Sequence, residues 1–316
     1  MLTRNGSTNI SISINNNNAT ALREHRHEKD QNGIYYIALL SVTVILHVLI
    51  QRIIRRKHLN DNQYHLIRVL SISDLFAVVA SIILNVYSIF QDSTSKEMSV
   101  LLSLSIYIGL SYSLIVTLVI AVDRWIAVKW CLHYYILIRR YRINIVLVIA
   151  GVVNAVTLTF LFYIFGVSSS EIKQNFYTSF GASAYLTTIR IVTCIVIIVL
   201  GKWTIFLRNQ SEIRLKNRTN IHGREAEKLD RTKQLKRSIK DVFKLNLWTC
   251  IFHLPLIVTA IFMILDSTLR GRLLYINVLA TAIYKLSNPI IYLTCFSKIR
   301  KYWMSFFRRQ VNPHEN

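Results

Sequence analysis

The stretch INIVLVIAGVVNAVTLTFLFYIFG, residues 143–166, contains no charged side chain. A helix of about 20 apolar residues is long enough to cross the hydrocarbon core of a bilayer, and such runs are unusual in soluble domains. Six further stretches have the same character, and each is bounded by charged or polar residues: 34–54, 66–90, 98–122, 180–206, 243–265 and 272–294. The sequence therefore predicts an all-α membrane protein, a bundle of seven transmembrane helices.

The predicted spans divide the chain into three parts. Residues 1–33 are polar and are expected to form a disordered extracellular tail, glycosylated at the sequons that begin at Asn5, Asn9 and Asn18. Residues 34–294 form the seven-transmembrane domain. Residues 295–316 contain FSKIRKYWMSFFRR, in which aromatic residues on one side of a helix are surrounded by cations. This pattern predicts a short amphipathic helix on the inner leaflet, followed by a short cytoplasmic tail.

The chain carries 38 Lys and Arg against 16 Asp and Glu, a formal net charge of +22. If the N-terminus is outside the cell, most of these cations fall in cytoplasmic loops, helix ends and the tail, as the positive-inside rule requires. We therefore expect a multi-pass plasma-membrane protein with an extracellular N-terminus and a cytoplasmic C-terminus. The same sorting assigns the excess charge to the lipid bilayer and argues against nucleic acid as a partner. The longest inner loop is 208–236, and only its second half is expected to be helical, as an extension of the sixth span.

Four short motifs interrupt the apolar spans. Asp74 lies within the second span in LSISDLF, and Asp123 and Arg124 close the third. Pro255 lies inside the sixth span, and NPIIY, residues 288–292, ends the seventh. A charged side chain at the centre of a membrane helix costs about 2.5–3.5 kcal/mol on insertion scales, so such residues usually have a partner or a function. A proline removes a backbone hydrogen bond and kinks the helix, which supplies a hinge.

In this order and in these spans, the motifs resemble those of the rhodopsin-like (class A) G-protein-coupled receptors, with landmarks over residues 66–303. The resemblance implies a receptor that binds an extracellular ligand and activates a heterotrimeric G protein. It implies that Arg124 holds the inactive state and contacts the G protein after activation; the alternative is a boundary arginine that reaches lipid phosphate. The residues implied in coupling, activation and the sixth-span hinge or switch are Asp123, Arg124, Trp125, Asn288, Pro289, Tyr292, His253 and Pro255.

Several positions depart from the family pattern. Trp125 replaces the usual tyrosine after the Asp-Arg pair, His253 replaces the tryptophan before the sixth-span proline, and His47 replaces the asparagine of the first span. Leu235 stands where relatives carry an acidic partner for the arginine, so the resemblance does not supply that ionic latch. Ser99 stands where the third span of relatives begins with a disulfide cysteine. No disulfide is expected, because the four cysteines fall in spans or at inner helix ends: Cys131, Cys194, Cys250 and Cys295.

A buried polar site is expected around Asp74. In relatives this carboxylate helps to bind a sodium ion with small polar residues of the third and seventh spans, and Ser113 fits one of these places. Lys285 lies three residues before Asn288, so the two share one face of the seventh span. We therefore hypothesise that the Lys285 ammonium pairs with Asp74 and occupies the place of the sodium ion. The alternative is a lysine turned toward water inside the bundle.

A ligand pocket is expected between the outer halves of the spans. The resemblance places the amine-binding aspartate of relatives at Ile106, which disfavours a biogenic amine. The one strong charge expected to face this region is that of Arg190. It either pairs with a ligand carboxylate or phosphate or reaches the outer headgroups. The apolar remainder suits a peptide, lipid-like or odorant ligand. The polar candidates for the lining are Asn85, Tyr107, Arg190, which supplies that charge, His253 and Tyr284.

Two other classes of function stay open. Asp74, Lys285 and His253 are compatible with a proton path in a seven-span transporter or channel, although no internal repeat is visible. A receptor-like protein that does not signal is the other, because several family features are replaced. No enzyme is indicated, since the sequence has no HExxH motif, phosphate-binding loop or nucleophile–base pair. No metal is expected from the histidine spacing, and no cofactor, since Ala282 occupies the position of the retinal lysine of opsins.

Overall fold

The computed structural model describes residues 33–55, 62–90, 96–130, 134, 138–167, 180–216, 225–265 and 270–311. The sequons at Asn5, Asn9 and Asn18 and nearly all of the predicted tail lie outside these residues. The regular elements within them are helices: a first helix over Gly33–Arg55, then α2 (Asn62–Phe90), α3 (Lys96–Lys129), α5 (Arg140–Val167), α6 (Phe180–Lys216), α7 (Glu225–Leu265), α8 (Arg270–Cys295) and α9 (Ser297–Val311).

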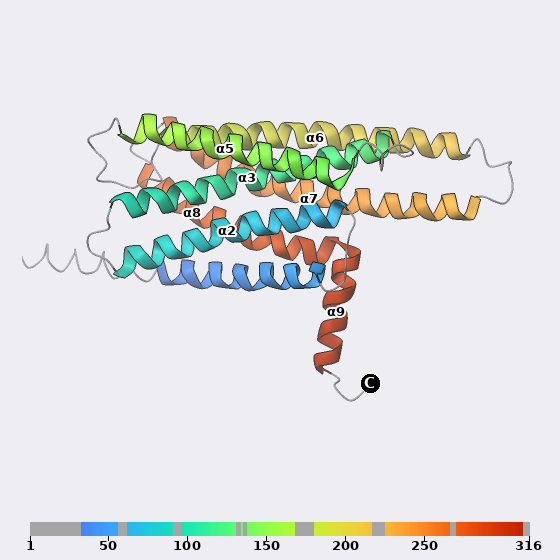
Figure 1. Ribbon diagram of the computed structural model, residues 1–316, viewed down its shortest axis with the longest axis horizontal. Helices are drawn as coiled ribbons and strands as arrows, with labels where there is room; N and C mark the ends of the chain where they lie inside the picture. The colour runs from blue at the N-terminus through green and yellow to red at the C-terminus, as the bar shows by residue number, and fades with distance from the viewer. Residues whose placement is uncertain are drawn as a thin grey trace, which may run out of the picture.

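The first helix, α2, α3 and α5 to α8 lie side by side along the longest direction of the molecule, and α9 runs across them at one end (Figure 1). Helix α3 is central, because it packs against α2, α5, α6 and α7. Helix α8 packs against α2, α7 and α9. The predicted all-α bundle, with a short helix after the last span, is confirmed.

Six of the helices in the described part of the chain are long and apolar enough to cross a membrane. Helix α8 is not among them, because Lys285, Asn288 and Pro289 make its central part more polar. The two polar side chains face the interior, since Lys285 and Asn288 are each 2% exposed. Helix α8 therefore completes the bundle with its polar residues turned inward.

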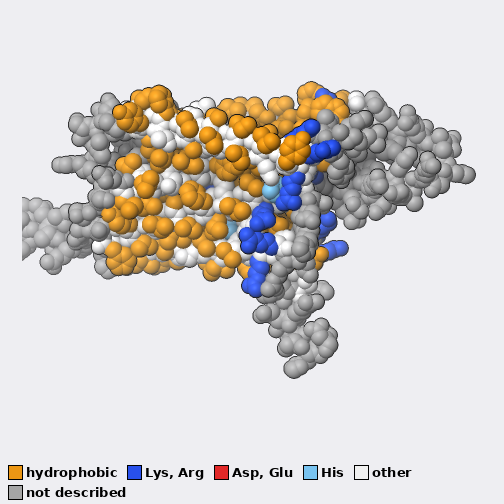
Figure 2. Space-filling view, viewed as in Figure 1, with side chains coloured by type: hydrophobic (Ala, Val, Ile, Leu, Met, Phe, Trp, Pro, Cys, Tyr) orange, Lys and Arg blue, Asp and Glu red, His pale blue; other side chains and the backbone are white. Residues whose placement is uncertain are grey.

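The face of the bundle seen in Figure 2 is largely apolar between its two ends. Along α5, for example, Val148 and Val156 are each 63% exposed, whereas Asn154 between them is 1% exposed. Apolar side chains outside and polar groups inside are the arrangement that hydrocarbon requires. Lys and Arg gather in a band at the end of the bundle from which α9 leaves (Figure 2), which we call the basic end.

Apolar packing at the basic end fixes the position of α9. Ile299 of α9 is 0% exposed and belongs to the same core cluster as Ile50 of the first helix, Leu66 of α2 and Tyr292 of α8. Arg300 and Lys301 are exposed on the other side of α9. The segment is therefore amphipathic, with one face held by the bundle and cations on the opposite face.

Helices α2 and α3 approach each other closely at Gly109. A Cβ atom added to Gly109 lies 2.8 Å from Ala77 Cβ and 3.2 Å from its backbone. Ser73 Oγ donates a hydrogen bond to the Gly109 carbonyl at 2.9 Å. Small residues at such crossings let helix backbones approach each other in membranes. This contact brings α2 and α3 within reach of a shared polar site.

Helices α6 and α7 differ in part from the prediction. Residues 208–216, the beginning of the predicted loop 208–236, are helical instead, because α6 continues to Lys216. Helix α7 begins at Glu225, so the expected inward extension of the sixth span is present. The two helices contact each other within the bundle, where Cys250 Sγ lies 4.0 Å from the Cys194 carbonyl oxygen. Both thiols are free.

Candidate functional site

The centre of the bundle holds polar side chains around Asp74 of α2. One carboxylate oxygen accepts hydrogen bonds from Lys285 Nζ of α8 and from Ser113 Oγ of α3, the latter at 2.7 Å. The other oxygen accepts a hydrogen bond from Asn288 Nδ2 at 2.8 Å. Lys285 and Asp74 thus form the hypothesised ion pair, and the lysine does not turn toward water. We call these four residues the Asp74 cluster.

The Asp74 cluster is closed to solvent, since Asp74 and Ser113 are 0% exposed. A lone carboxylate in such a place is very unfavourable, whereas a paired and fully hydrogen-bonded one is tolerated. Lys285 supplies the opposite charge, and Ser113 and Asn288 supply two neutral donors. The cluster therefore joins α2, α3 and α8 through one carboxylate without leaving a net charge.

A second polar contact lies one turn away on α2. His47 Nδ1 of the first helix and Ser71 Oγ are 2.9 Å apart, and both residues are 0% exposed. His47 thus fills the place of the expected asparagine with a bond between the first helix and α2. On α8, the Tyr292 ring packs against Phe296 at 6.4 Å between centroids, and its buried hydroxyl has no hydrogen-bond partner within the described residues.

Asp123 and Arg124 form a second ionic site at the basic end of α3. Arg124 Nε donates to Asp123 Oδ2 at 2.9 Å, and the Tyr134 hydroxyl donates to Asp123 Oδ1 at 2.6 Å. Arg124 also lies 3.4 Å from Gln63 Oε1 of α2. Burial, together with the nearby Asp123 carboxylate, raises the pKa of Tyr134 well above its usual value, so its phenol stays protonated and donates. We call these four residues the Arg124 cluster.

The Arg124 side chain is enclosed rather than extended toward a lipid surface. It is 12% exposed and the Asp123 side chain is 3% exposed. The arrangement is that of a paired arginine and not that of a boundary arginine reaching for phosphate. The contact with Gln63 and the position of Tyr134 just after α3 show that α2 and the segment after α3 hold the ion pair.

Trp125 points to a different set of neighbours. Its ring lies 5.6 Å from the Trp130 ring and 6.0 Å from the Trp203 ring of α6. Lys129 Nζ lies 4.8 Å from the Trp125 centroid, within the range of a cation–π contact. Trp125 therefore links α3 to α6 at the basic end.

Pro255 lies inside α7 and Pro289 inside α8. Two residues before Pro255, the His253 ring lies 4.3 Å from the Tyr284 ring of α8. His253 is 2% exposed, and both of its ring nitrogens lack a hydrogen-bond partner within the described residues. His253, which stands where the family has a tryptophan, thus makes an aromatic contact between α7 and α8. This contact leaves its two buried ring nitrogens unsatisfied.

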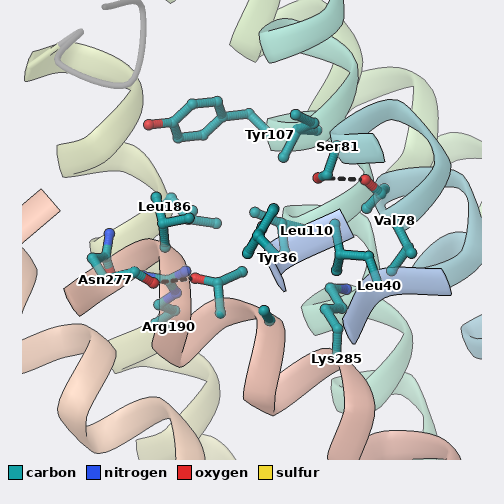
Figure 3. A pocket seen from close by; sticks show the side chains of 15 residues that line it. Tyr36, Leu40, Val78, Ser81, Tyr107, Leu110, Leu186, Arg190, Asn277 and Lys285 are labelled. Atoms are coloured by element: carbon teal, nitrogen blue, oxygen red, sulfur yellow. Dashed lines mark hydrogen bonds between the residues drawn. The ribbon is translucent and has the colours of Figure 1, made fainter. Parts of the chain in front are cut away.

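A hollow with about 560 Å³ of empty space, which includes space open to solvent, lies between the first helix, α2, α3, α6 and α8, away from the basic end. We call it the large cavity. Of the predicted polar candidates, Tyr107 and Arg190 line it, whereas Asn85, His253 and Tyr284 do not. Figure 3 shows Arg190 beside Asn277 on one side and Lys285 below Leu40 on the other. Lys285 of the Asp74 cluster thus forms part of the cavity lining.

A smaller cavity of about 310 Å³ lies next to Arg124, between α3, α6 and α7. Its lining includes Gly201 and Thr204 of α6 and Val242 and Asn246 of α7. This hollow separates the Arg124 cluster from the two helices that extend furthest beyond the bundle at the basic end (Figure 1).

Some site residues were not foreseen from the sequence. Tyr134 and Gln63 hold the Asp123–Arg124 pair, and Tyr36 and Asn277 line the large cavity. Tyr134 lies beyond the end of α3 and outside any predicted span, so helical periodicity does not mark it. Tyr36 and Asn277 carry no signal beyond lying near the outer ends of spans. Within the described ranges, no group of three or more His, Cys, Asp or Glu is placed to hold a metal ion.

These features define a class: a helical membrane bundle with a hollow between the helices at one end and an enclosed Asp-Arg pair at the other. Over residues 44–292 the sequence matches the family described as 7 transmembrane receptor (rhodopsin family). The chain therefore belongs to the rhodopsin family of seven-transmembrane receptors, and it is a multi-pass membrane protein. No curated individual protein matches it.

Proposed function

We propose that this receptor binds an extracellular ligand in the large cavity and activates heterotrimeric G proteins at its basic end. The basic end faces the cytoplasm, because Lys and Arg concentrate there as the positive-inside rule requires. The N-terminus is then extracellular, the protein resides in the plasma membrane, and α9 lies on the anionic inner leaflet with Arg300 and Lys301 toward the lipid.

The observation that carries the proposal is the enclosed Arg124 beside the small cavity. Asp123 and Tyr134 hold the guanidinium on the side of α2, and the hollow between α6 and α7 lies on its other side. If α7 moves away from α3, this hollow opens and Arg124 turns into it. A cation at the base of such an opening is positioned to contact a G protein, as the family resemblance implies.

Movement of α7 has a physical route from the ligand cavity. Pro255 removes a backbone hydrogen bond within α7, which makes a hinge at that level. His253 contacts Tyr284 of α8, and Tyr284 is adjacent in sequence to Lys285, which lines the cavity. Asn288, Pro289 and Tyr292 continue this path along α8 toward the basic end. A ligand that displaces Lys285 therefore shifts the neighbouring Tyr284 and biases the position of α7.

A test that needs no known ligand is basal nucleotide exchange. The full-length receptor and its Asp123→Asn variant are reconstituted with representatives of each Gα class, and GTPγS binding is measured. Loss of the ionic hold on Arg124 is expected to raise exchange several-fold on at least one Gα, and the double variant Asp123→Asn/Arg124→Ala is expected to remove the increase. A panel of candidate ligands, read with a promiscuous Gα, then searches for the agonist.

Two outcomes contradict the proposal. Equal, background-level exchange for wild type and Asp123→Asn on every Gα class, with normal amounts of folded protein, indicates a receptor-like protein that does not signal. Ligand-independent ion flux through liposomes that depends on Asp74 or Lys285 indicates a transporter or channel instead.

A further inference from the structure

The large cavity contains one cation for which the described residues of the lining supply no counter-charge. Arg190 of α6 is 3% exposed, and its Nε has no hydrogen-bond partner within the described residues. No Asp or Glu is among the described residues that line the cavity. The other cation of the lining, Lys285, is neutralised by Asp74. The cavity therefore presents one net positive charge, which comes from Arg190.

An unpaired buried cation is unfavourable in the free protein. The same bundle shows how a buried charge is normally accommodated, since Asp74 and Lys285 compensate each other and have further donors. Arg190 has no such arrangement with the residues that the structure describes. It does not reach the outer headgroups either, because almost none of its surface is exposed. Violations of this kind are retained where a binding partner completes them.

The cavity is polar near Arg190 and apolar away from it. Figure 3 places the Asn277 carboxamide beside Arg190, so that a second donor lies near the guanidinium. Across the cavity, Leu40 of the first helix and Val78 of α2 form an apolar wall, with Leu110 of α3 beside them. A ligand that fits this pattern has a charged group at one end and an apolar body that reaches toward the first helix and α2.

We propose that the large cavity binds a small amphiphile with one anionic group, a carboxylate or a phosphate monoester, held by Arg190. This inference rests on the proposed function only in taking the cavity as the ligand site. The guanidinium offers a planar fork of donors that matches the oxygens of either anion. A cationic ligand is disfavoured, because it would add a second positive charge beside Arg190, and the described lining contains no free carboxylate.

The test uses four probes with the same alkyl chain: octanoate, octyl phosphate, 1-octanol and octylamine. Full-length receptor is placed in nanodiscs of phosphatidylcholine, and binding of radiolabelled octanoate is measured directly and by competition. Octanoate is expected to bind saturably, and octyl phosphate to compete, whereas octanol and octylamine do not. The ranking of octanoate and octyl phosphate identifies a free carboxylate or a phosphate headgroup as the source of the anion.

Variants locate the binding. Arg190→Gln is expected to weaken octanoate binding by at least about tenfold, since a charge-assisted hydrogen bond is lost. Lys202→Gln removes a cation from the other end of the same helix and is expected to leave binding unchanged. In the absence of probe, Arg190→Met is expected to unfold at the same or a higher temperature than wild type, because it removes an uncompensated buried charge. A purely structural arginine gives a lower unfolding temperature.

Three results overturn the inference: octanol competing as well as octyl phosphate, octanoate binding unchanged in Arg190→Gln, or no saturable binding of either anion to wild type. None of these measurements contains a G protein, and the Asp123→Asn exchange assay contains no ligand. Failure of one assay therefore does not follow from failure of the other.

Discussion

Removal of Lys285 is the most direct perturbation of the buried centre. In Lys285→Met, Asp74 keeps only the neutral donors Ser113 and Asn288, and its carboxylate stays 0% exposed. In Asp74→Asn, the lysine is left charged instead. In the double variant Asp74→Asn/Lys285→Met, both charges disappear while the side-chain volumes are nearly conserved. These three proteins separate the cost of an unpaired charge from the worth of the pair.

The expected magnitude follows from burial. Breaking a fully buried pair from one side costs about 3–5 kcal/mol, whereas replacing both partners is close to neutral. An independent estimate agrees, because protonating a carboxyl of ordinary acidity at pH 7 costs about 4 kcal/mol. At roughly 2–4 °C per kcal/mol for a protein of this size, Lys285→Met lowers the unfolding midpoint by about 6–20 °C. The double variant is expected to lie within a few degrees of wild type.

The assay is thermal unfolding of the full-length receptor in nanodiscs, followed with a thiol-reactive fluorophore that labels the cysteines as they become accessible. The loss of unfolding free energy in Lys285→Met, relative to wild type, is expected to shrink by about 1.4 kcal/mol for each unit by which the pH falls, because proton uptake by Asp74 becomes easier. Sodium chloride is expected to raise its midpoint relative to N-methylglucamine chloride, since a small cation can pair with Asp74 in the vacated space. Wild type is expected to show no such difference.

The reasoning is refuted if the double variant is as unstable as the sum of the single variants, since the two residues then do not interact. A wild-type midpoint that rises with sodium as steeply as that of Lys285→Met also contradicts it, because Lys285 then does not occupy the cation site. If Lys285→Met loses little unfolding free energy relative to wild type, and the loss does not change with pH, water reaches Asp74.

Three further changes probe other parts of the bundle. Tyr134→Phe removes the 2.6 Å hydrogen bond to Asp123 and is expected to raise basal GTPγS exchange, by less than Asp123→Asn does. Gly109→Ala places a Cβ atom 2.8 Å from Ala77 Cβ and is expected to lower the unfolding midpoint, at a cost of about 1–3 kcal/mol. His253→Phe keeps the ring contact with α8 and removes two unsatisfied buried nitrogens. It is expected to raise the free energy of unfolding by about 1–3 kcal/mol, and the unfolding midpoint with it.

Each change has a matched control. Tyr141→Phe alters an exposed tyrosine at the start of α5 and is expected to leave basal exchange unchanged. Gly201→Ala places its Cβ atom 3.4 Å from the Phe243 ring and is expected to be tolerated. Equal destabilisation by both glycine variants contradicts the close approach of α2 and α3. A lower midpoint for His253→Phe shows that an unseen partner satisfies the imidazole.

The fold could be predicted from the sequence because a helix that crosses the hydrocarbon core of a bilayer must be long and apolar. Uncharged runs of sufficient length, such as 143–166, leave few alternatives to a spanning helix. The contact of Lys285 with Asp74 was also predictable, since the family resemblance places the seventh span beside Asp74, the three-residue spacing from Asn288 sets the face of the helix, and a buried charge requires a partner. Local rules of this kind depend on one helix at a time.

Features that depend on several helices were not readable. The large cavity excludes Asn85, His253 and Tyr284 because tilt and depth, which sequence spacing does not give, decide which inward side chains reach it. Tyr134 lies outside any span, so no periodicity marks it as a partner of Asp123. The continuation of α6 to Lys216 was missed because a charged helix in water has no apolar face to reveal it.

The neighbouring free cysteines Cys194 and Cys250 make it possible to measure whether α6 and α7 are in contact. A short bifunctional mercurial or maleimide reagent would bridge the two sulfurs only while the helices remain adjacent. The yield of bridged protein, read by mass spectrometry of the native chain, therefore reports the fraction of molecules in which the two helices are in contact. No engineered label is needed to follow the receptor as it switches.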